Sequence, residues 1–488
     1  MLPRPDLVGK NLREFDRTLF DKDVEITGVA LNADEIKPGD LFIALTGAKT
    51  HGLNFVNTAI ANGAVAVLSD KPAEITVPLF LSQDAKQLVG EISAWYNENP
   101  FSKLIAIGIT GTNGKTTTVN LLKQIWQLAG EKSGVIGTLG TEINDKRYSG
   151  LRTTPEACEL QSIAALMVQE KVSNLAMEVS SHALIQKRLS GAHFKIAGFT
   201  NLTQDHLDFH GTMEAYFAAK SRLFDNELSD VAVINIDDQY GKKLFDSKLV
   251  SAKSVSRIEK NGNWHYQKYS ATKNGFDIEI INPQNQLISA FFPLLGEHNL
   301  DNLILAVAIA AETGVSTESI AIAIPKLKSV AGRLEQLNLG QSFNALVDYA
   351  HTPDAVERVL TSAKGFTSGK IIAILGCGGD RDSGKRPLMG LALKNNTDVA
   401  VFTSDNPRSE APAEILKQMV GSLDISLPNK VIADRKEAIS YAVSIAQSGD
   451  TILLMGKGHE DGQEINGEIT PFNDVTELTA AIKKALAK

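Results

Sequence analysis

A glycine-rich loop that carries a lysine and several hydroxyl groups is the first candidate for chemistry in this sequence. Residues 109–118 read ITGTNGKTTT and lie between the apolar run KLIAIGIT and the helical pattern KTTTVNLLKQIWQLAG. Gly111 and Gly114 let the backbone curl close to phosphate oxygens, and the N-terminus of the following helix adds unsatisfied N–H groups. Lys115 can reach the outer phosphates of a nucleotide, and the Thr116 hydroxyl can bind Mg²⁺.

The spacing of this loop differs from the Walker pattern G-x-x-x-x-G-K-[ST]. That pattern requires a glycine five places before Gly114, where the chain has Ile109. The alternative is an ordinary glycine turn before a helix. Because an apolar strand precedes the loop and a helix follows it, the context favours a phosphate-binding loop.

Composition and charge exclude several classes of protein. The chain has 488 residues, 43% hydrophobic and 22% charged, which is typical of a globular protein of about three domains. Its net charge is −8 and it has no block of basic residues, so we expect no nucleic-acid partner. The two cysteines, Cys158 and Cys377, offer neither a disulfide framework nor metal-ligand spacing, and they predict a reducing, cytoplasmic location.

No membrane insertion is expected. The N-terminus lacks the apolar core of a signal peptide, and the longest apolar run, residues 303–311, is shorter than the roughly 20 residues that span a bilayer.

The elements around the loop follow an alternating strand and helix pattern. Apolar runs with polar residues at their C-terminal ends recur, and this indicates an α/β fold with ligands at the carboxyl edge of a sheet. These runs are KLIAIGITG (103–111), NLAMEVSS (174–181), KIAGFTNLT (195–203), DVAVINIDD (230–238), KIIAILGCGGD (370–380), DVAVFTSDNP (398–407) and DTILLMGKGHE (450–460).

The loop and further segments together resemble the Mur ligase family. TGTNGKTTT is similar to that family's shortened nucleotide loop, in which the two glycines are three places apart. Other similar segments follow in the family's order: MEVSSHALIQKRL, FTNLTQDHLDFHGTMEAYFAAK, INIDD, GEHNLDN, AGRLE, VDYAHTPDA, GCGGDRDSGKRPLMG, SDNPRSEAP and MGKGHED. The resemblance covers almost the whole chain.

The resemblance implies an α/β protein of three domains. These are a UDP-sugar-binding N-terminal domain (1–100), a central ATP-binding domain with a P-loop-type, mostly parallel sheet (101–333), and a Rossmann-like C-terminal domain that binds an amino acid (334–488). It also implies ATP as co-substrate and Mg²⁺ as cofactor. The ATP-binding residues carried over from the family are Gly111, Thr112, Asn113, Gly114, Lys115, Thr116, Thr117, Asn299, Asn302, Arg333 and Asp348.

Four residues are implied for catalysis: Lys115, Glu178, His206 and Lys220. The metal ligands would be Thr116, Glu178, His206 and Lys220, the last as a carbamylated lysine. Taken alone, the glutamate and the histidine would more often be caps or satisfied polar residues, and Lys220 would be a lysine on a helix surface. Carbamylation needs a neutral amine, and therefore a lysine pKa that burial or a neighbouring charge has lowered.

A UDP-sugar peptide is the implied acceptor. The residues carried over for it are Leu31, Ala33, Ala48, Lys49, Thr50, Thr153, Thr154, Ser180, Gln186 and Arg188. Where the family usually shows Asp-Ser-Arg, this chain has Asn-Ala-Asp at 32–34, so a hydroxyl and a cation are missing from the expected uridine site.

The incoming amino acid is predicted from the DNPR segment. Diaminopimelate differs from lysine by a second carboxylate, and arginine presents a planar fork that matches a carboxylate. The implied pocket is Arg381, Asp405, Asn406, Pro407, Arg408, Gly456 and Glu460, in which Glu460 could pair with the distal ammonium. Alternatively, Arg408 caps or pairs locally with Glu410.

The expected activity is that of a cytoplasmic, monomeric ligase. Using ATP, it would add meso-diaminopimelate to UDP-N-acetylmuramoyl-L-alanyl-D-glutamate through an acyl phosphate. Three alternatives stay open: a sibling ligase that adds L-lysine, another diamino acid or a dipeptide; a folylpolyglutamate synthase; and a P-loop ATPase that acts as a motor or switch.

Overall fold

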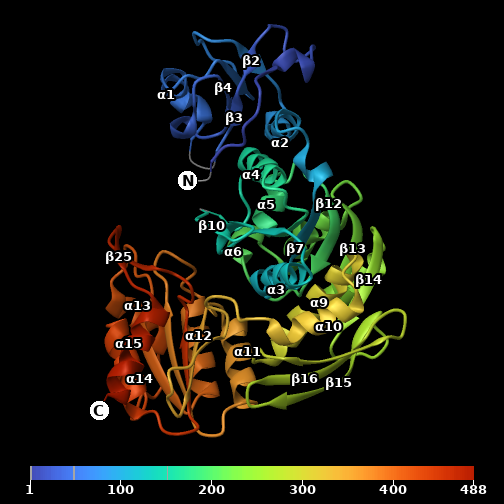
Figure 1. Cartoon of the computed structure of the whole chain (residues 1–488). Helices are drawn as coiled ribbons and strands as arrows, with labels where there is room; N and C mark the ends of the chain where they lie inside the picture. The colour runs from blue at the N-terminus through green and yellow to red at the C-terminus, as the bar shows by residue number, and fades with distance from the viewer. Residues whose placement is uncertain (1–2, 48–49, 151, 488) are drawn as a thin grey trace.

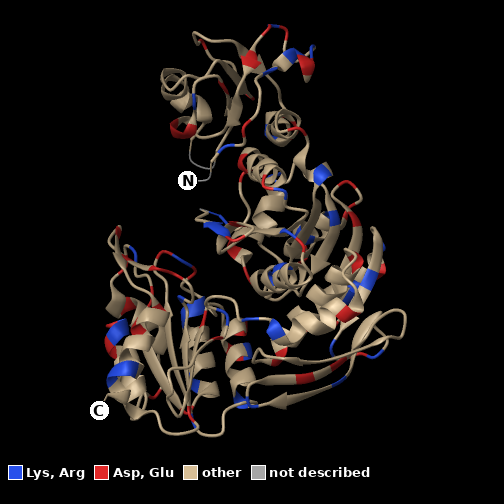
Figure 2. Ribbon diagram, viewed as in Figure 1, with Lys and Arg blue, Asp and Glu red and all other residues tan. Residues whose placement is uncertain are grey.

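The protein is built around three open sheets, each with its own covering helices (Figure 1). The computed structural model describes residues 3–47, 50–150 and 152–487. In Figure 1 the N-terminal sheet lies at one end, the large central sheet follows, and the C-terminal sheet lies at the other end. Acidic and basic residues are interspersed along the ribbon (Figure 2), and none of the described helices is long and apolar enough to cross a membrane.

The N-terminal unit is a 4-stranded parallel sheet with the order β3-β4-β5-β6. Its strands are β3 (Gly28–Ala30), β4 (Asp40–Ala44), β5 (Ala66–Ser69) and β6 (Leu79–Leu81), and its helices are α1 (Val56–Ala61) and α2 (Ala85–Tyr96). The apolar runs of β4 and β5 are buried on both faces, as parallel strands require.

The central unit is an 11-stranded sheet whose middle strands run parallel in the order β8-β11-β7-β12-β13-β14. The strands are β8 (Ser133–Gly137), β11 (Asn174–Glu178), β7 (Ile105–Thr110), β12 (Phe194–Phe199), β13 (Ser229–Asn235) and β14 (Ser251–Ser256). In the register of this sheet Glu178 pairs with Ile109 and Phe199 with Thr110. The ends of three strands therefore meet at the glycine loop.

Helices and an antiparallel extension complete the central unit. Helix α3 (Lys115–Leu128) follows the loop, and the apolar helix α9 (Glu297–Glu312) packs beside it in the same core. The sheet continues through β15 (Trp264–Thr272), β16 (Gly275–Ile281) and β17 (Leu287–Phe292), which are antiparallel to one another. The opposite edge of the sheet is formed by β9 (Gly140–Ile143) and β10 (Lys146–Tyr148). The central unit also contains the helices α4 (Ala157–Gln169), α5 (Ser181–Ile185), α6 (Leu207–His210) and α7 (Met213–Ser221).

The C-terminal unit is a 6-stranded sheet with the order β18-β19-β23-β20-β21-β22, parallel except for β18. Its strands are β18 (Glu335–Leu337), β19 (Asn344–Asp348), β23 (Thr451–Met455), β20 (Ile371–Cys377), β21 (Val399–Ser404) and β22 (Lys430–Val431). Helices α11 (Pro353–Lys364), α12 (Lys385–Asn396), α13 (Pro412–Val420), α14 (Arg435–Ile445) and α15 (Asp474–Leu486) cover its two faces.

A buried ion pair joins the strand ends of this unit. Arg435 and Asp474 are both fully buried and 2.6 Å apart, and Arg435 also donates to the carbonyls of Ser404 and Met455. The segments that follow β21 and β23 are therefore held side by side. Each apolar run predicted from the sequence contains a strand, and the predicted α/β class is confirmed. We propose that the domains follow the three sheets, at 1–100, 101–333 and 334–488.

Candidate functional site

The glycine loop has a conformation that only glycine fits. Gly111 and Gly114 have φ angles of 144° and 87°, in the region that side chains rarely adopt. A Cβ atom at Gly111 would overlap the Thr200 hydroxyl, and one at Gly114 would overlap the Asn302 amide. The loop thus lies directly against the segment after β12 and against helix α9.

Hydrogen bonds from the segment after β12 hold the loop open. The Thr112 N–H donates to the Asn201 carbonyl at 2.8 Å, and the Asn113 N–H donates to the Asn201 side chain at 3.0 Å. The Thr200 hydroxyl donates to the Asn113 carbonyl at 2.6 Å. These hydrogen bonds fix the backbone of the loop against the segment after β12.

Lys115 and Thr116 begin helix α3 at the floor of the site. The Lys115 ammonium donates to the carbonyls of Gly111 and Thr112, both at 2.8 Å, and burial lowers its pKa. Thr116 is buried and accepts from an Arg333 nitrogen at 3.3 Å. Arg333 is at the boundary between the central and C-terminal units, two residues before β18 begins.

Glu178 is a fully buried carboxylate at the end of β11. It accepts from the Thr138 N–H at 2.8 Å and from the Thr138 hydroxyl at 3.1 Å. Among the described residues no lysine or arginine forms an ion pair with it. A buried carboxylate of this kind is suited to a ligand cation, because its charge is otherwise uncompensated.

Lys220 lies inside the site and not on the surface of its helix. It is 2% exposed, its Nζ donates to the Gly111 carbonyl at 2.8 Å, and it lies over the Tyr216 ring. Burial, followed by the charge of Lys115, holds the pKa of Lys220 well below its usual value. The alternative of a surface lysine is wrong, because the side chain is buried.

His206 lies at the entrance to the same centre. It adopts a left-handed conformation with φ 53° before α6, and its ring is half-exposed beside Asp205. Partial burial lowers the pKa of His206 to about 4, although Asp205 opposes this shift. A neutral imidazole can bind a metal ion. Within the described ranges, no three His, Cys, Asp or Glu side chains form a ready metal cluster.

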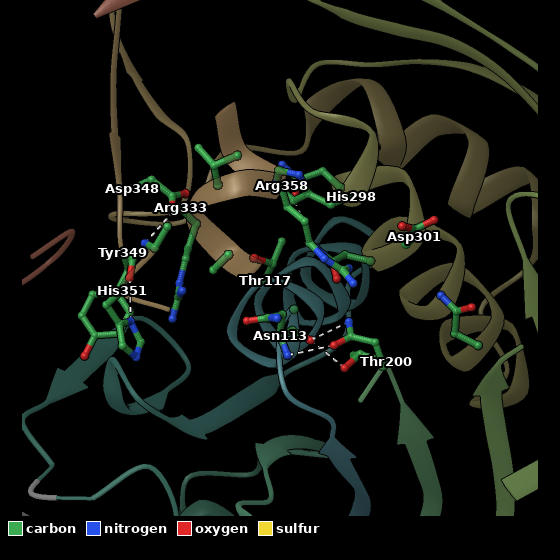
Figure 3. Close-up of a pocket in the computed structure, with 18 residues that line it drawn as sticks. Asn113, Thr117, Thr200, His298, Asp301, Arg333, Asp348, Tyr349, His351 and Arg358 are labelled. Carbon is green, nitrogen blue, oxygen red and sulfur yellow. Dashed lines mark hydrogen bonds between the residues drawn. The ribbon is translucent and has the colours of Figure 1, made fainter. Parts of the chain in front are cut away.

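A pocket opens above the loop, between the central and C-terminal units (Figure 3). Seven of the residues predicted for ATP line it: Asn113, Gly114, Thr117, Asn299, Asn302, Arg333 and Asp348. The remaining lining residues were not predicted: Thr200, Asn201, Asn235, His298, Asp301, Tyr349, Ala350, His351, Ala355, Arg358 and Val359. Their position at strand ends could have indicated Thr200, Asn201 and Asn235, but nothing in the sequence indicates the residues from α11.

Three of the residues predicted for ATP are held by internal hydrogen bonds. Asn299 donates to the Leu295 carbonyl at 2.8 Å, and Asn302 donates to Asn299 at 3.2 Å. Asp348 accepts the N–H groups of Leu334 and Ala350 at 2.7 and 2.8 Å, and burial raises its pKa. These contacts fix the orientation of each polar group at the pocket wall.

The residues predicted for the UDP-sugar peptide divide into two groups. Around Glu178, the Thr154 hydroxyl donates to the Glu178 carbonyl at 2.8 Å, Arg188 donates to the Thr154 carbonyl at 3.1 Å, and the Ser180 N–H donates to Thr154 at 3.0 Å. Thr153 contacts Thr138 and Gln186 ends α5. The second group, Leu31, Ala33 and Thr50, lies in the N-terminal unit, whereas Ala48 and Lys49 lie outside the described residues.

A second cluster of polar side chains lies at the ends of β21 and β23 in the C-terminal unit. Asn406 donates to Glu460 at 2.8 Å, and the fully buried Lys457 donates to both Asn406 and Glu460 at 2.9 Å. Gly456 allows close approach, because a Cβ there would lie 2.7 Å from an Asp405 oxygen. Lys457 was not predicted, although it lies within the MGKGHED segment.

Arg408 is tied to the loop after β20 rather than to Glu410. Its guanidinium donates to the Gly379 carbonyl at 2.7 Å and lies 3.3 Å from Glu464. Glu410 instead pairs with Arg386 at 2.7 Å, so the predicted alternative of an Arg408–Glu410 pair is wrong. Of the other predicted pocket residues, Arg381 is exposed and Pro407 is buried.

Comparisons with known proteins agree with this arrangement. Sequence profiles described as the catalytic domain of the Mur ligase family, the Mur ligase middle domain and the Mur ligase glutamate ligase domain match residues 25–101, 109–310 and 332–458. A UDP-N-acetylmuramoyl-L-alanyl-D-glutamate–2,6-diaminopimelate ligase from Streptomyces coelicolor is 41% identical over 475 residues, which cover 95% of this chain and 94% of the relative. The ligase of the same name from Geobacillus thermodenitrificans is 39% identical over 94% of this chain and 95% of its own length.

Solved structures give the same result. A UDP-N-acetylmuramoyl-L-alanyl-D-glutamate–2,6-diaminopimelate ligase aligns with a TM-score of 0.71 and 34% identity, covering 98% of this chain and 100% of that structure. MurF ligase from Thermotoga maritima, solved in complex with ADP, shares the fold at 17% identity with a TM-score of 0.64, covering 94% of this chain and 98% of that structure. The motifs, the fold and these matches together show that the chain belongs to the Mur ligase family.

Proposed function

We propose that this protein is an ATP-dependent ligase that joins meso-diaminopimelate to UDP-N-acetylmuramoyl-L-alanyl-D-glutamate, a step of peptidoglycan precursor synthesis. The γ-phosphoryl group of ATP passes to the D-glutamyl γ-carboxylate and gives an acyl phosphate and ADP. The amine of diaminopimelate then attacks the acyl carbon, and an amide forms as phosphate leaves. The relatives at 39–41% identity carry the name of this activity.

One observation supports this proposal most directly: three side chains, Lys115, Glu178 and Lys220, lie together at the glycine loop. Activation of a carboxylate by ATP brings several negative groups together, and cations must offset their repulsion. Lys115 is positioned to meet the phosphates of ATP, and Arg333 reaches the same place from the C-terminal side. The Thr153–Thr154 segment and Arg188 lie next to Glu178 and would bind the acceptor there.

Mg²⁺ fits the donor set of this centre. The Thr116 hydroxyl and the buried, unpaired Glu178 carboxylate would hold one ion, and His206 with a carbamylated Lys220 would hold a second. The buried Lys220 amine contacts a hydroxyl and a carbonyl, and no carboxylate among the described residues contacts it, which favours its neutral form. Addition of CO₂ to that neutral amine releases one proton and gives a carboxylate-like ligand. When bound, the metal would neutralise the charge that develops on the phosphoryl group.

Arg408 supports diaminopimelate as the amino acid. Its guanidinium contacts Glu464, and a carboxylate of the ligand would replace Glu464 as its partner. Glu460 would meet the distal ammonium in exchange for Lys457. A charge-assisted hydrogen bond contributes about 1.5–3 kcal/mol, so we expect diaminopimelate to be preferred over lysine by about 10–150-fold. We place the enzyme in the cytoplasm as a monomer.

A product assay tests this function against its rivals. Purified protein is incubated with ATP, Mg²⁺ and the UDP-sugar dipeptide, and meso-diaminopimelate, L-lysine or L-ornithine is offered separately while product mass is measured. The diaminopimelate adduct is expected, with ATP consumed only when both substrates are present. A lysine adduct without a diaminopimelate adduct would show a sibling ligase, and ATP turnover without amino acid would show a motor or switch. In a parallel incubation with ATP, a folate and glutamate, addition of glutamate to the folate would show a folylpolyglutamate synthase.

A further inference from the structure

A hairpin of two short strands, β24 (Gly462–Ile465) and β25 (Glu468–Pro471), lies against the DNPR segment. The Arg408 N–H donates to the Glu464 carbonyl at 3.0 Å, and the Asn466 N–H donates to the Arg408 carbonyl at 2.7 Å. The φ angle of Arg408 is 52°, in the left-handed region that side chains rarely adopt. The two main-chain hydrogen bonds from the hairpin therefore fix Arg408 in an unusual backbone conformation.

The hairpin also contacts the polar cluster at the ends of β21 and β23. The Gln463 amide donates to the Asp405 carbonyl at 2.6 Å, and the Glu464 N–H donates to the Asn406 side chain at 3.1 Å. The same Asn406 oxygen accepts from the buried Lys457 at 2.9 Å. Residues of the hairpin are thus in direct contact with the residues that we propose for the amino acid.

The Arg408 side chain is paired with Glu464 only weakly. One terminal nitrogen donates to the Gly379 carbonyl at 2.7 Å, and Nε lies 3.3 Å from a Glu464 carboxylate oxygen. The other terminal nitrogen has no partner among the described residues. Both side chains of the ion pair are partly exposed, at 22% and 38%. Because a partly exposed ion pair contributes little to stability, a better-placed carboxylate can displace Glu464 from Arg408.

We propose that Glu464 is a specificity-determining residue that competes with the distal carboxylate of the incoming amino acid for Arg408. The inference rests on the proposed function and adds to it a residue that tunes the choice of amino acid. An amino acid with a distal carboxylate must break the Arg408–Glu464 pair, whereas lysine leaves that pair intact. Glu464 therefore holds the preference for diaminopimelate below the value that Arg408 alone would give.

Steady-state ligation assays with the full-length Glu464→Gln variant test this competition. The kcat/KM for meso-diaminopimelate should rise by about two- to fivefold, because a partly exposed ion pair no longer has to be broken. The kcat/KM for L-lysine should stay unchanged, so the ratio of the two values rises by the same factor. Glu468→Gln removes an exposed carboxylate from the other strand of the hairpin and is the matched control, which should change neither value.

A double variant separates competition for Arg408 from a general effect on the hairpin. In Arg408→Ala the guanidinium is absent, so adding Glu464→Gln should bring no gain for meso-diaminopimelate. A gain that persists in the double variant overturns the inference, as does an unchanged or lower ratio in Glu464→Gln. If the wild-type protein forms no diaminopimelate adduct, the proposed function fails and the inference fails with it. If the wild-type adduct forms and the ratio does not rise, only the inference fails.

Discussion

The two polar sites of this protein treat charge in opposite ways. At the glycine loop, Glu178 and Lys220 are buried without an oppositely charged partner among the described residues. In the C-terminal pocket, Lys457 and Arg408 already have carboxylate partners. The groups of the first site lack counter-charges within the described part of the protein, whereas those of the second site already form ion pairs.

This difference teaches how each site can recognise its ligand. Buried, unpaired charges are costly, so the loop gains most from phosphates and metal ions that supply the missing counter-charges. Where charges are already paired, ligand binding gains only the difference in free energy between the old and the new partners. Such a site can therefore discriminate between similar ligands. We expect changes at the loop to abolish activity and changes in the C-terminal pocket to alter substrate choice.

Replacement of Lys220 is the strongest test of the expectation that changes at the glycine loop abolish activity. Lys220→Ala is expected to lower kcat by about 10³-fold, because a metal ion that it supports contributes several kcal/mol. Steady-state ligation assays measure the loss, and short carboxylic acids in the buffer should partly restore the rate. Lys195→Ala, which removes an exposed lysine of β12, is the control. Full activity of Lys220→Ala would remove its metal-supporting role.

Replacement of Arg408 tests the expectation that changes in the C-terminal site alter substrate choice. Arg408→Ala should lower kcat/KM for meso-diaminopimelate by about 10–150-fold, because a charge-assisted hydrogen bond to the distal carboxylate is lost. The kcat/KM for L-lysine should stay unchanged. Lys417→Ala, at an exposed position in the same unit, serves as control. An equal loss for both amino acids would show that Arg408 supports the fold of the pocket and not its selectivity.

A smaller effect is expected where the two sites meet. Lys385 of α12 lies 2.7 Å from Asp205 of the central unit, and both side chains are partly buried. Lys385→Met should lower kcat by about two- to fivefold, since such a pair contributes up to about 1 kcal/mol, and Lys385→Arg should retain the rate. Lys370→Met is the control. A loss above about 100-fold would place Lys385 in contact with substrate instead.

The smallest effect concerns stability in acid. Arg386 holds the pKa of Glu410 to about 2, below its ordinary value. The pair therefore stabilises the fold fully above the unfolded pKa of about 4.3, and this contribution disappears as pH falls towards 2. In Glu410→Gln, circular dichroism should show a weaker acid dependence of the unfolding midpoint between these values. Glu357→Gln is the matched control, and an identical pH profile for both variants would contradict the assignment.

Sequence reasoning predicted the α/β fold well because its signals are local. Each of the seven predicted strands was a contiguous apolar run, and the glycine loop lay between one such run and a helix, so these predictions came from adjacent residues. The family resemblance then indicated seven of the 18 residues that line the pocket above the loop. It did not indicate Lys457, which contacts Asn406 and Glu460, or the α11 side chains.

The sequence by itself determined the order of strands, loops and helices along the chain and the chemical groups that they carry. Only the tertiary structure decided that Lys220 is buried, that Arg408 has Glu464 and not Glu410 as its partner, and that Arg358 faces the nucleotide pocket. The physical reason is that burial and pairing depend on segments far apart in the chain. Lys220 meets Gly111 and Asp354 meets Asn113 only after the sheets have packed together.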